Sequence, residues 1–181
     1  MQGIRTDGRR VKFNIWHLIL ALFLILVDQL TKVIFRNLSL NHGWQSTCII
    51  QDFFYFDYTF NTGAAFSFLS DAPWAQTFFK VLTIVALIGF YAYYVVLSNG
   101  KNYVGRIAML LIICGAMGNL IDRFAYNGVV DFISFIFWGS PFAIFNLADS
   151  YLTIGVILII IHLLFLDKNA VFKGEKVEKN N

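Results

Sequence analysis

The stretch IWHLILALFLILVDQLTKVIF, residues 15–35, decides the fold of this chain. It reaches the roughly 20 predominantly apolar residues that a helix needs to cross a bilayer. Arg5, Arg9, Arg10 and Lys12 precede it, as basic residues precede a secretory signal. However, no small-residue cleavage site follows the stretch, so it predicts a transmembrane helix that is retained.

The composition extends this prediction to the whole chain. Hydrophobic residues make up 58% of the 181 residues, charged residues make up 14%, and the mean hydropathy is +0.66. This is more apolar side chain than a soluble domain of this length buries, which excludes the soluble globular class. Three further stretches are long and apolar enough to span, at about 74–97, 104–125 and 147–166. We therefore expect one all-α integral membrane domain over residues 1–166, with four transmembrane helices.

The basic residues indicate which connections share a side of the membrane. Most of them lie in three segments that a four-span chain places together: Arg5, Arg9, Arg10 and Lys12 before the first span, Lys101 and Arg106 between the second and third, and Lys168, Lys173, Lys176 and Lys179 in the last tail. We expect both termini to be cytoplasmic. The last tail, residues 167–181, mixes Lys and Glu without periodicity, which predicts a disordered cytoplasmic segment.

The two other connections, about 36–73 and 126–146, are then expected to face outward. Residues 49–60 are rich in aromatic and β-branched side chains, which favours strands. They predict a small extracytoplasmic β-element at about 38–66. Residues 135–142 are too apolar for a solvated loop, so we expect an interfacial loop that lies against the bundle.

Polar side chains inside or beside the predicted spans fall on single helix faces near the outer end. They are Asp28 with Lys32, Asn119 with Asp122 and Arg123, and Asn146 with Asp149. Because all three clusters lie at one depth, a shared pocket is the simplest account of them. Ionisable groups at this depth cost several kcal/mol unless they are paired or wet, so they often mark function.

Two aspartates favour a specific chemistry. Asp131 follows Val129 and Val130, and Asp149 begins the last apolar stretch. Carboxylates brought together at such a place share a proton, because like charges at contact distance raise one pKa. This is typical of an aspartyl hydrolase. Structural roles are the alternative: neutralisation of Asp28 by Lys32, an Asp122 pair with Arg123, and a helix-cap pair of Asp131 with Asp149.

Other chemistries lack their parts in this sequence. His17, His42 and His162 are scattered along the chain, so neither a metal site nor a Ser-His-Asp triad can be assembled from them. There is no glycine-rich phosphate loop and no basic-aromatic patch for nucleic acid. We expect no metal and no cofactor. The residues alone leave open a small transporter or proton-relay protein that uses the same acids, or a lipid-binding scaffold.

Five ordered motifs resemble the lipoprotein signal peptidases, or signal peptidase II, a family of bacterial membrane aspartyl proteases. The resemblance covers about residues 24–165. The motifs are Asp28-Gln29-Leu30-Thr31-Lys32, Asn61-Thr62-Gly63-Ala64-Ala65-Phe66, Gly118-Asn119-Leu120-Ile121-Asp122-Arg123, Val129-Val130-Asp131-Phe132 and Phe145-Asn146-Leu147-Ala148-Asp149-Ser150.

The resemblance implies a role for each matching residue. It implies a catalytic dyad of Asp131 and Asp149. It implies that the substrate pocket is formed by Asn61, Gly63, Asn119, Arg123 and Asn146. It also implies that the fold is supported by Asp28, Lys32 and Asp122.

The resemblance further implies the partners and the location. The substrates would be prolipoproteins that carry diacylglycerol on a cysteine and are cut just before it, within membrane lipid. A globomycin-type inhibitor would block the site, no nucleic acid would be bound, and the protein would act as a monomer. The location would be the bacterial cytoplasmic (inner) membrane, with the active site near the outer face.

Overall fold

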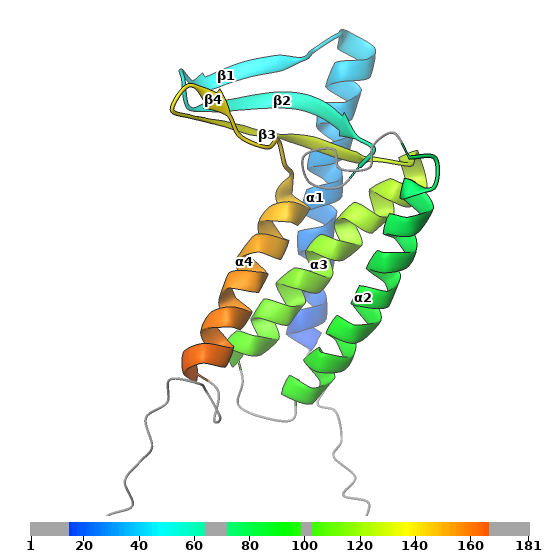
Figure 1. Cartoon of the computed structure of the whole chain (residues 1–181), viewed down its shortest axis with the longest axis vertical. Helices are drawn as coiled ribbons and strands as arrows, with labels where there is room; N and C mark the ends of the chain where they lie inside the picture. Colours follow the sequence, from blue (N-terminus) through cyan, green and yellow to red (C-terminus); the bar gives the residue numbers. More distant parts are fainter. Residues whose placement is uncertain (1–14, 64–71, 99–102, 167–181) are drawn as a thin grey trace, which may run out of the picture.

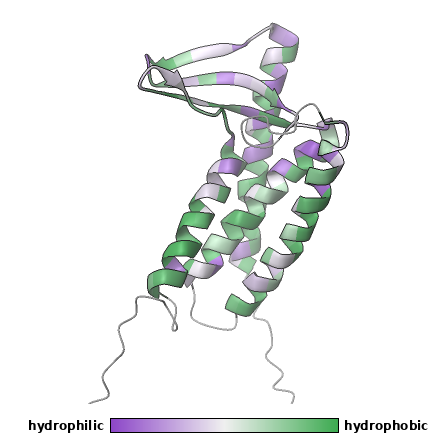
Figure 2. Ribbon diagram, in the orientation of Figure 1, coloured by the Kyte–Doolittle hydropathy of each residue, from purple (hydrophilic) through white to green (hydrophobic). Residues whose placement is uncertain are grey.

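The protein is an integral membrane bundle of four helices with a small sheet across one end (Figure 1). The computed structural model describes residues 15–63, 72–98 and 103–166. The helices are α1 (Ile15–His42), α2 (Ala75–Ser98), α3 (Tyr103–Tyr126) and α4 (Leu147–Ile161), and a π-helical turn continues α4 over His162–Leu166. All four are long and apolar enough to cross a membrane, and Figure 2 shows apolar residues along most of their length. The four predicted spans are confirmed; the predicted tail, residues 167–181, lies outside the described residues.

Helix α3 is the central element of the bundle, because it packs against each of the other three helices. Of its most apolar window, 67% is buried within the protein, against 17% or less for α1, α2 and α4. The other three helices therefore turn most of their apolar surface toward lipid. Polar residues on α3 face protein, and this is the position in which a membrane protein can keep them.

Glycines let the backbones of α3 and α4 approach closely. A Cβ added at Gly155 would lie 2.7 Å from Cγ1 of Ile112 and 2.8 Å from the carbonyl oxygen of Ala108. A Cβ added at Gly115 would meet the carbonyl oxygen of Ala148. Small residues at such crossings are typical of membrane helix pairs, where close packing replaces the hydrophobic effect. This contact sets the distance between the helices that carry Asn119 and Asp149.

The sheet combines both connections at that end of the bundle. Its antiparallel order is β1 (Ser46–Ile50), β2 (Phe54–Asn61), β3 (Val129–Phe137) and the short β4 (Ser140–Pro141). The β-element predicted in the first connection is thus present, although α1 extends to His42 before it begins. The second connection is more regular than the expected interfacial loop. Its apolar residues tolerate this position because β3 pairs its backbone with β2.

The sheet is fixed to the bundle by aromatic packing. Phe35 of α1 stacks on Phe132 of β3 with ring centroids 4.3 Å apart, and it also contacts Phe56 of β2 at 5.0 Å. These contacts explain why α1 continues past the predicted end at residue 35. They also hold β3, and with it Asp131, over the ends of α3 and α4.

Candidate active site

Three buried charges form a closed cluster between α1 and α3. The Lys32 ammonium lies 2.9 Å from Asp28 and 3.2 Å from Asp122, and it donates to Oδ1 of Asn119 at 2.9 Å. Its three donors thus have three acceptors. The side chains of Lys32 and both aspartates are at most 2% exposed. The Asp28 pair with Lys32 occurs as the sequence suggested, whereas Asp122 pairs with Lys32 rather than with its neighbour Arg123.

The same cluster connects four parts of the fold. Oδ1 of Asp28 accepts the backbone N–H of Ala148 in the first turn of α4 at 2.8 Å, and Oδ2 of Asp122 accepts that of Val130 in β3 at 3.1 Å. Gln29 of α1 donates to Oδ1 of Asp122 at 3.0 Å. The supporting role expected for these acids therefore has a concrete form, in which they fix the start of α4 and the strand that carries Asp131.

Asp149 is oriented by the start of α4. Asn146 is the N-cap: its Oδ1 accepts the Asp149 N–H at 3.0 Å, and Oδ2 of Asp149 accepts the Asn146 N–H at 3.2 Å. This is a capping box, and the positive end of the helix dipole favours a carboxylate there. The other oxygen, Oδ1, accepts Nδ2 of Asn119 at 2.7 Å. Among the described residues, the hydrogen bonds to the Asp149 carboxyl thus come from neutral donors.

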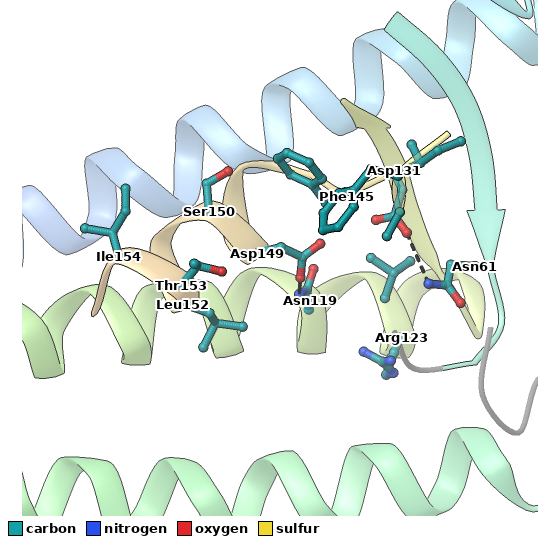
Figure 3. Close-up of a pocket in the computed structure, with 14 residues that line it drawn as sticks. Asn61, Asn119, Arg123, Asp131, Phe145, Asp149, Ser150, Leu152, Thr153 and Ile154 are labelled. Atoms are coloured by element: carbon teal, nitrogen blue, oxygen red, sulfur yellow. Dashed lines mark hydrogen bonds between the residues drawn. The ribbon is translucent and has the colours of Figure 1, made fainter. Parts of the chain in front are cut away.

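Asp131 of β3 is held in the same way. Its Oδ1 accepts Nδ2 of Asn146 at 2.7 Å, and its Oδ2 accepts Nδ2 of Asn61 at 3.1 Å (Figure 3). The side chain is only 3% exposed. Burial, followed by the charge of Asp149, raises the pKa of Asp131 to about 7, although the two amide donors oppose the rise. This carboxyl can therefore exchange a proton near neutral pH.

A cavity of about 710 Å³ brings the two aspartates together. Asp131 enters from β3 and Asp149 from α4, and both line the cavity. Its polar lining further includes three residues that the sequence predicted, Asn61, Asn119 and Arg123, and two that it did not, Ser150 and Thr153. The apolar remainder includes Phe142 and Phe145. Two carboxyls, amides and a cation thus face one largely apolar space.

Arg123 is the cation of this cavity. Its NH2 donates to the carbonyl oxygen of Gly63 at 2.8 Å, and its guanidinium carbon lies 5.0 Å from the centroid of the Phe79 ring. Its Nε is buried without a hydrogen-bond partner in the described part of the chain. Arg123 therefore keeps donor capacity for a bound molecule.

Two predicted pocket residues occupy other positions. Asn146 is 0% exposed and is not among the cavity's lining residues; it lies behind both aspartates and bonds to each. Gly63 is also absent from the lining, but its N–H donates to Oδ1 of Asn61 at 2.9 Å and its carbonyl receives Arg123. Both residues thus position lining side chains from outside the cavity.

The structure also identifies residues that the sequence reasoning missed. Gln29 bridges Asp28 and Asp122 from within the quoted motif. Ser150 and Thr153 lie one and four residues after Asp149, the spacing that would have placed them near it on α4. No group of three His, Cys, Asp or Glu side chains suited to a metal occurs among the described residues.

Comparisons with known proteins identify the family of this chain. The profile of the family described as signal peptidase (SPase) II matches residues 20–165. A lipoprotein signal peptidase of Bacillus velezensis is 42% identical over 148 residues, which cover 81% of this chain and 92% of the relative. One from Staphylococcus aureus is 39% identical over 163 residues, 90% of this chain and 94% of the relative.

Two solved structures match the fold of this chain. A structure of a bacterial membrane enzyme superposes with a TM-score of 0.75 at 38% identity, covering 91% of this chain and 94% of that one. A second, also described as a bacterial membrane enzyme, gives 0.71 at 36% identity, covering 89% and 100%.

Proposed function

The chain belongs to the signal peptidase II family, and from that membership we propose that it is an aspartic endopeptidase that processes lipoproteins. We infer that it removes the signal peptide of a diacylglyceryl-modified prolipoprotein by cutting just before the lipidated cysteine. The observation that carries the aspartic mechanism is the pair Asp131 and Asp149, which face one cavity with only neutral donors as partners. Such a pair can hold one proton and exchange it.

We propose that Asp131 holds that proton at rest and that Asp149 is ionised. The Lys32 ammonium donates to Oδ1 of Asn119, whose Nδ2 donates to Asp149, so the cation polarises the amide toward that carboxylate. The helix N-terminus adds to the same preference. Asp131 receives the amides of Asn61 and Asn146, and its pKa of about 7 leaves it substantially protonated at neutral pH.

The reaction then follows from these two states. Ionised Asp149 accepts a proton from water while the water oxygen bonds to the scissile carbonyl carbon, and Asp131 donates its proton to the carbonyl oxygen. In the second step the diol returns a proton to Asp131, and the proton held by Asp149 passes to the nitrogen as the C–N bond breaks. The products are a new carboxyl terminus and a free amino group on the cysteine, and both aspartates regain their starting states.

The remaining polar lining serves the peptide backbone. A substrate amide left without a partner in an apolar cavity costs about 1–3 kcal/mol. Asn61, Asn119 and Arg123 offer donors and acceptors at the positions where such amides would lie, and the free Nε of Arg123 suits a substrate carbonyl. We propose that the acyl chains of the substrate stay in the lipid beside the bundle, so that binding requires no deep apolar slot.

The orientation in the membrane is part of the same proposal. The distribution of basic residues favours both termini in the cytoplasm, which puts the sheet, the cavity and both aspartates near the outer face of the bacterial inner membrane. A lipoprotein precursor that has begun to cross that membrane would present its cleavage site at this depth.

One experiment separates the proposal from its rival. The purified protein in detergent is incubated with a diacylglyceryl-modified precursor and, in parallel, with the same precursor lacking the lipid, each with and without globomycin. We expect only the modified precursor to be cut, at the bond before the cysteine as read by mass spectrometry, and globomycin to stop the reaction. Ion flux through liposomes without any cleavage would instead support a transporter or proton-relay protein.

A further inference from the structure

A second buried cation lies at the opposite end of the bundle from the cavity. Arg106 is the fourth residue of α3 and is only 8% exposed. Its guanidinium carbon lies 4.6 Å from the centroid of the Tyr103 ring. Its Nε is buried without a partner, and no hydrogen bond or ion pair joins Arg106 to any described residue. This differs from Lys32, whose three donors all have acceptors.

No carboxylate is available to neutralise Arg106 within the described ranges. All the acids there belong to the sheet end of the molecule: Asp28, Asp52, Asp57, Asp122, Asp131 and Asp149. A guanidinium removed from water without an anion is strongly unfavourable. Within residues 15–63, 72–98 and 103–166, Arg106 is therefore a buried cation without an anionic partner, and its counterion has to come from outside this part of the structure.

The position of Arg106 along α3 points to the source of that partner. At a rise of about 1.5 Å per residue, it lies roughly 4.5 Å from the first residue of a helix that crosses the bilayer. This is the level at which the hydrocarbon core, about 30 Å thick, meets the lipid headgroups. A side chain that merely snorkels would expose its charged tip to that layer. Arg106 is instead only 8% exposed, and its ring partner Tyr103 lies at the boundary.

Neighbouring helices add polar groups at the same end. Nδ1 of His17 on α1 lies 2.6 Å from the hydroxyl of Tyr94 on α2, and the charge of Arg106 acts on both groups. Tyr103, 66% exposed, places an aromatic ring at the boundary beside the guanidinium. Polar side chains of α1, α2 and α3 are thus present at an end of the bundle that lacks any carboxylate in the described residues.

We propose that Arg106 binds the phosphate of an anionic phospholipid in the leaflet opposite the catalytic aspartates. The planar guanidinium fork matches two phosphate oxygens, and basic pockets between transmembrane helices are known to hold such headgroups. A lipid with one net negative charge neutralises the lone cation. The ammonium of a zwitterionic ethanolamine headgroup would find no carboxylate here, so the site favours phosphatidylglycerol-type lipids.

The test measures lipid binding, which is independent of proteolysis. The purified full chain in neutral detergent is titrated with phosphatidylglycerol or phosphatidylethanolamine, and bound lipid is counted by native mass spectrometry. We expect the wild type to retain phosphatidylglycerol preferentially, and Arg106→Gln to retain at least tenfold less. Arg106→Lys, which keeps the charge but loses the fork, should fall between them. It also serves as the test if the glutamine variant does not fold.

The matched control is Arg36→Gln. Arg36 on α1 also stacks on a tyrosine, with its guanidinium carbon 4.3 Å from the centroid of Tyr126, but it lies at the sheet end. We expect its loss to leave phosphatidylglycerol binding unchanged. Equal retention by wild type and both Arg106 variants would overturn the proposal. Displacement of the lipid by inorganic phosphate at equal concentration would overturn the lipid assignment and indicate a site for a free anion.

Discussion

Two pairs of aspartates lie at the same depth in this bundle and differ in their partners. Asp28 and Asp122 share the ammonium of Lys32, at 2.9 and 3.2 Å. Asp131 and Asp149 receive only amide N–H groups and face a cavity. A shared cation holds the first pair together in a closed cluster. Neutral donors orient the second pair without themselves carrying a positive charge. One of the two carboxyl groups can therefore keep its proton.

This difference shows that one pair of aspartates stabilises the fold, whereas the other is available for proton transfer. The two pairs are joined by one residue, because Oδ1 of Asn119 accepts from Lys32 and its Nδ2 donates to Asp149. The closed pair, Asp28 and Asp122, therefore acts as a fixed support. Through Asn119 it also biases the protonation of the open pair, Asp131 and Asp149. Both pairs consist of two carboxyl groups at a similar depth. What distinguishes them is the hydrogen-bond and ion-pair partners of those groups.

The largest expected effect comes from replacing either aspartate of the open pair, Asp131 and Asp149. Asp131→Asn and Asp149→Asn each remove the group that must hold or accept a proton, so cleavage of a lipid-modified precursor should fall by at least about 10³-fold. The bundle should still fold, because an amide keeps the size of the carboxyl. Turnover is measured with purified protein, and folding is checked by circular dichroism.

The control for this test is Asp57→Asn. Asp57 lies on β2, where it receives the hydroxyl of Ser46 away from the cavity, so its loss should leave turnover within about twofold, as for surface changes in general. Near-normal turnover by the Asp131 or Asp149 variant would refute the catalytic assignment of that residue.

The next largest effect comes from removing the cation that the closed pair, Asp28 and Asp122, shares. Lys32→Met leaves Asp28 and Asp122 buried without their cation, which should destabilise the protein by about 3–5 kcal/mol. Unfolding in micelles is followed by thermal denaturation. The control is Lys80→Met, because Lys80 donates to the exposed Asn127 at 2.8 Å and should contribute less than about 1 kcal/mol. Equal stability of wild type and Lys32→Met would show that the closed pair does not depend on its cation.

A smaller effect comes from cutting the link between the pairs. Asn119→Ala removes the donor to Asp149 and the acceptor for Lys32, so we expect kcat to fall about 10- to 100-fold, as when a supporting partner of a reactive group is lost. The alkaline limb of the pH profile should also move. Asn37→Ala, on the exposed surface of α1, is the control. A rise in KM with unchanged kcat would instead assign Asn119 to substrate binding alone.

The smallest effect is the pH dependence that Asp131 confers. Since its pKa is about 7, turnover should decline as pH rises through 7, because the proton-donating form is lost. The folded protein also holds this proton at pH values where an unfolded aspartate, with a pKa near 3.9, has lost it. Stability should therefore fall as pH rises from about 4 to about 7.

Thermal melts at pH 5 and pH 8 check this sign. The wild type should lose stability over that range, and Asp131→Asn should lose less, because it has no proton to release. If the melting temperature of the wild type rises between pH 5 and pH 8 by as much as that of Asp131→Asn, the pKa assigned to Asp131 is contradicted.

The sequence predicted the four spans because each is a long apolar run, a pattern that lipid as solvent makes easy to recognise. It did not predict β3. The burial of Val129–Phe137 lacks the simple alternation of a half-exposed strand, since the first four residues are all buried, so only the pairing with β2 identifies the segment as a strand. Phe35 similarly continues α1 beyond the apolar run through contacts made far away in sequence.

At the site, the sequence identified residue types and clusters but not directions. The spacing of Asn146 and Asp149 placed both on one helix face, yet whether Asn146 faces the cavity depends on β3, whose Asp131 receives its Nδ2. The helix-cap alternative for the two aspartates was partly right, because Asp149 is the N3 residue of the capping box at the start of α4, with Asn146 rather than Asp131 as its partner. Such choices are set by tertiary contacts that no local pattern encodes.

The hydrogen bond from Ala148 to Asp28 has a consequence for biosynthesis. It joins residues 120 positions apart, so the carboxyl group that completes the start of the final helix is translated long before that helix leaves the ribosome. Nascent chains that lack this helix carry Asp131 without Asp149. On the proposed mechanism they would be inert toward passing precursors, and activity would begin only when the last segment has been inserted and has docked against the first.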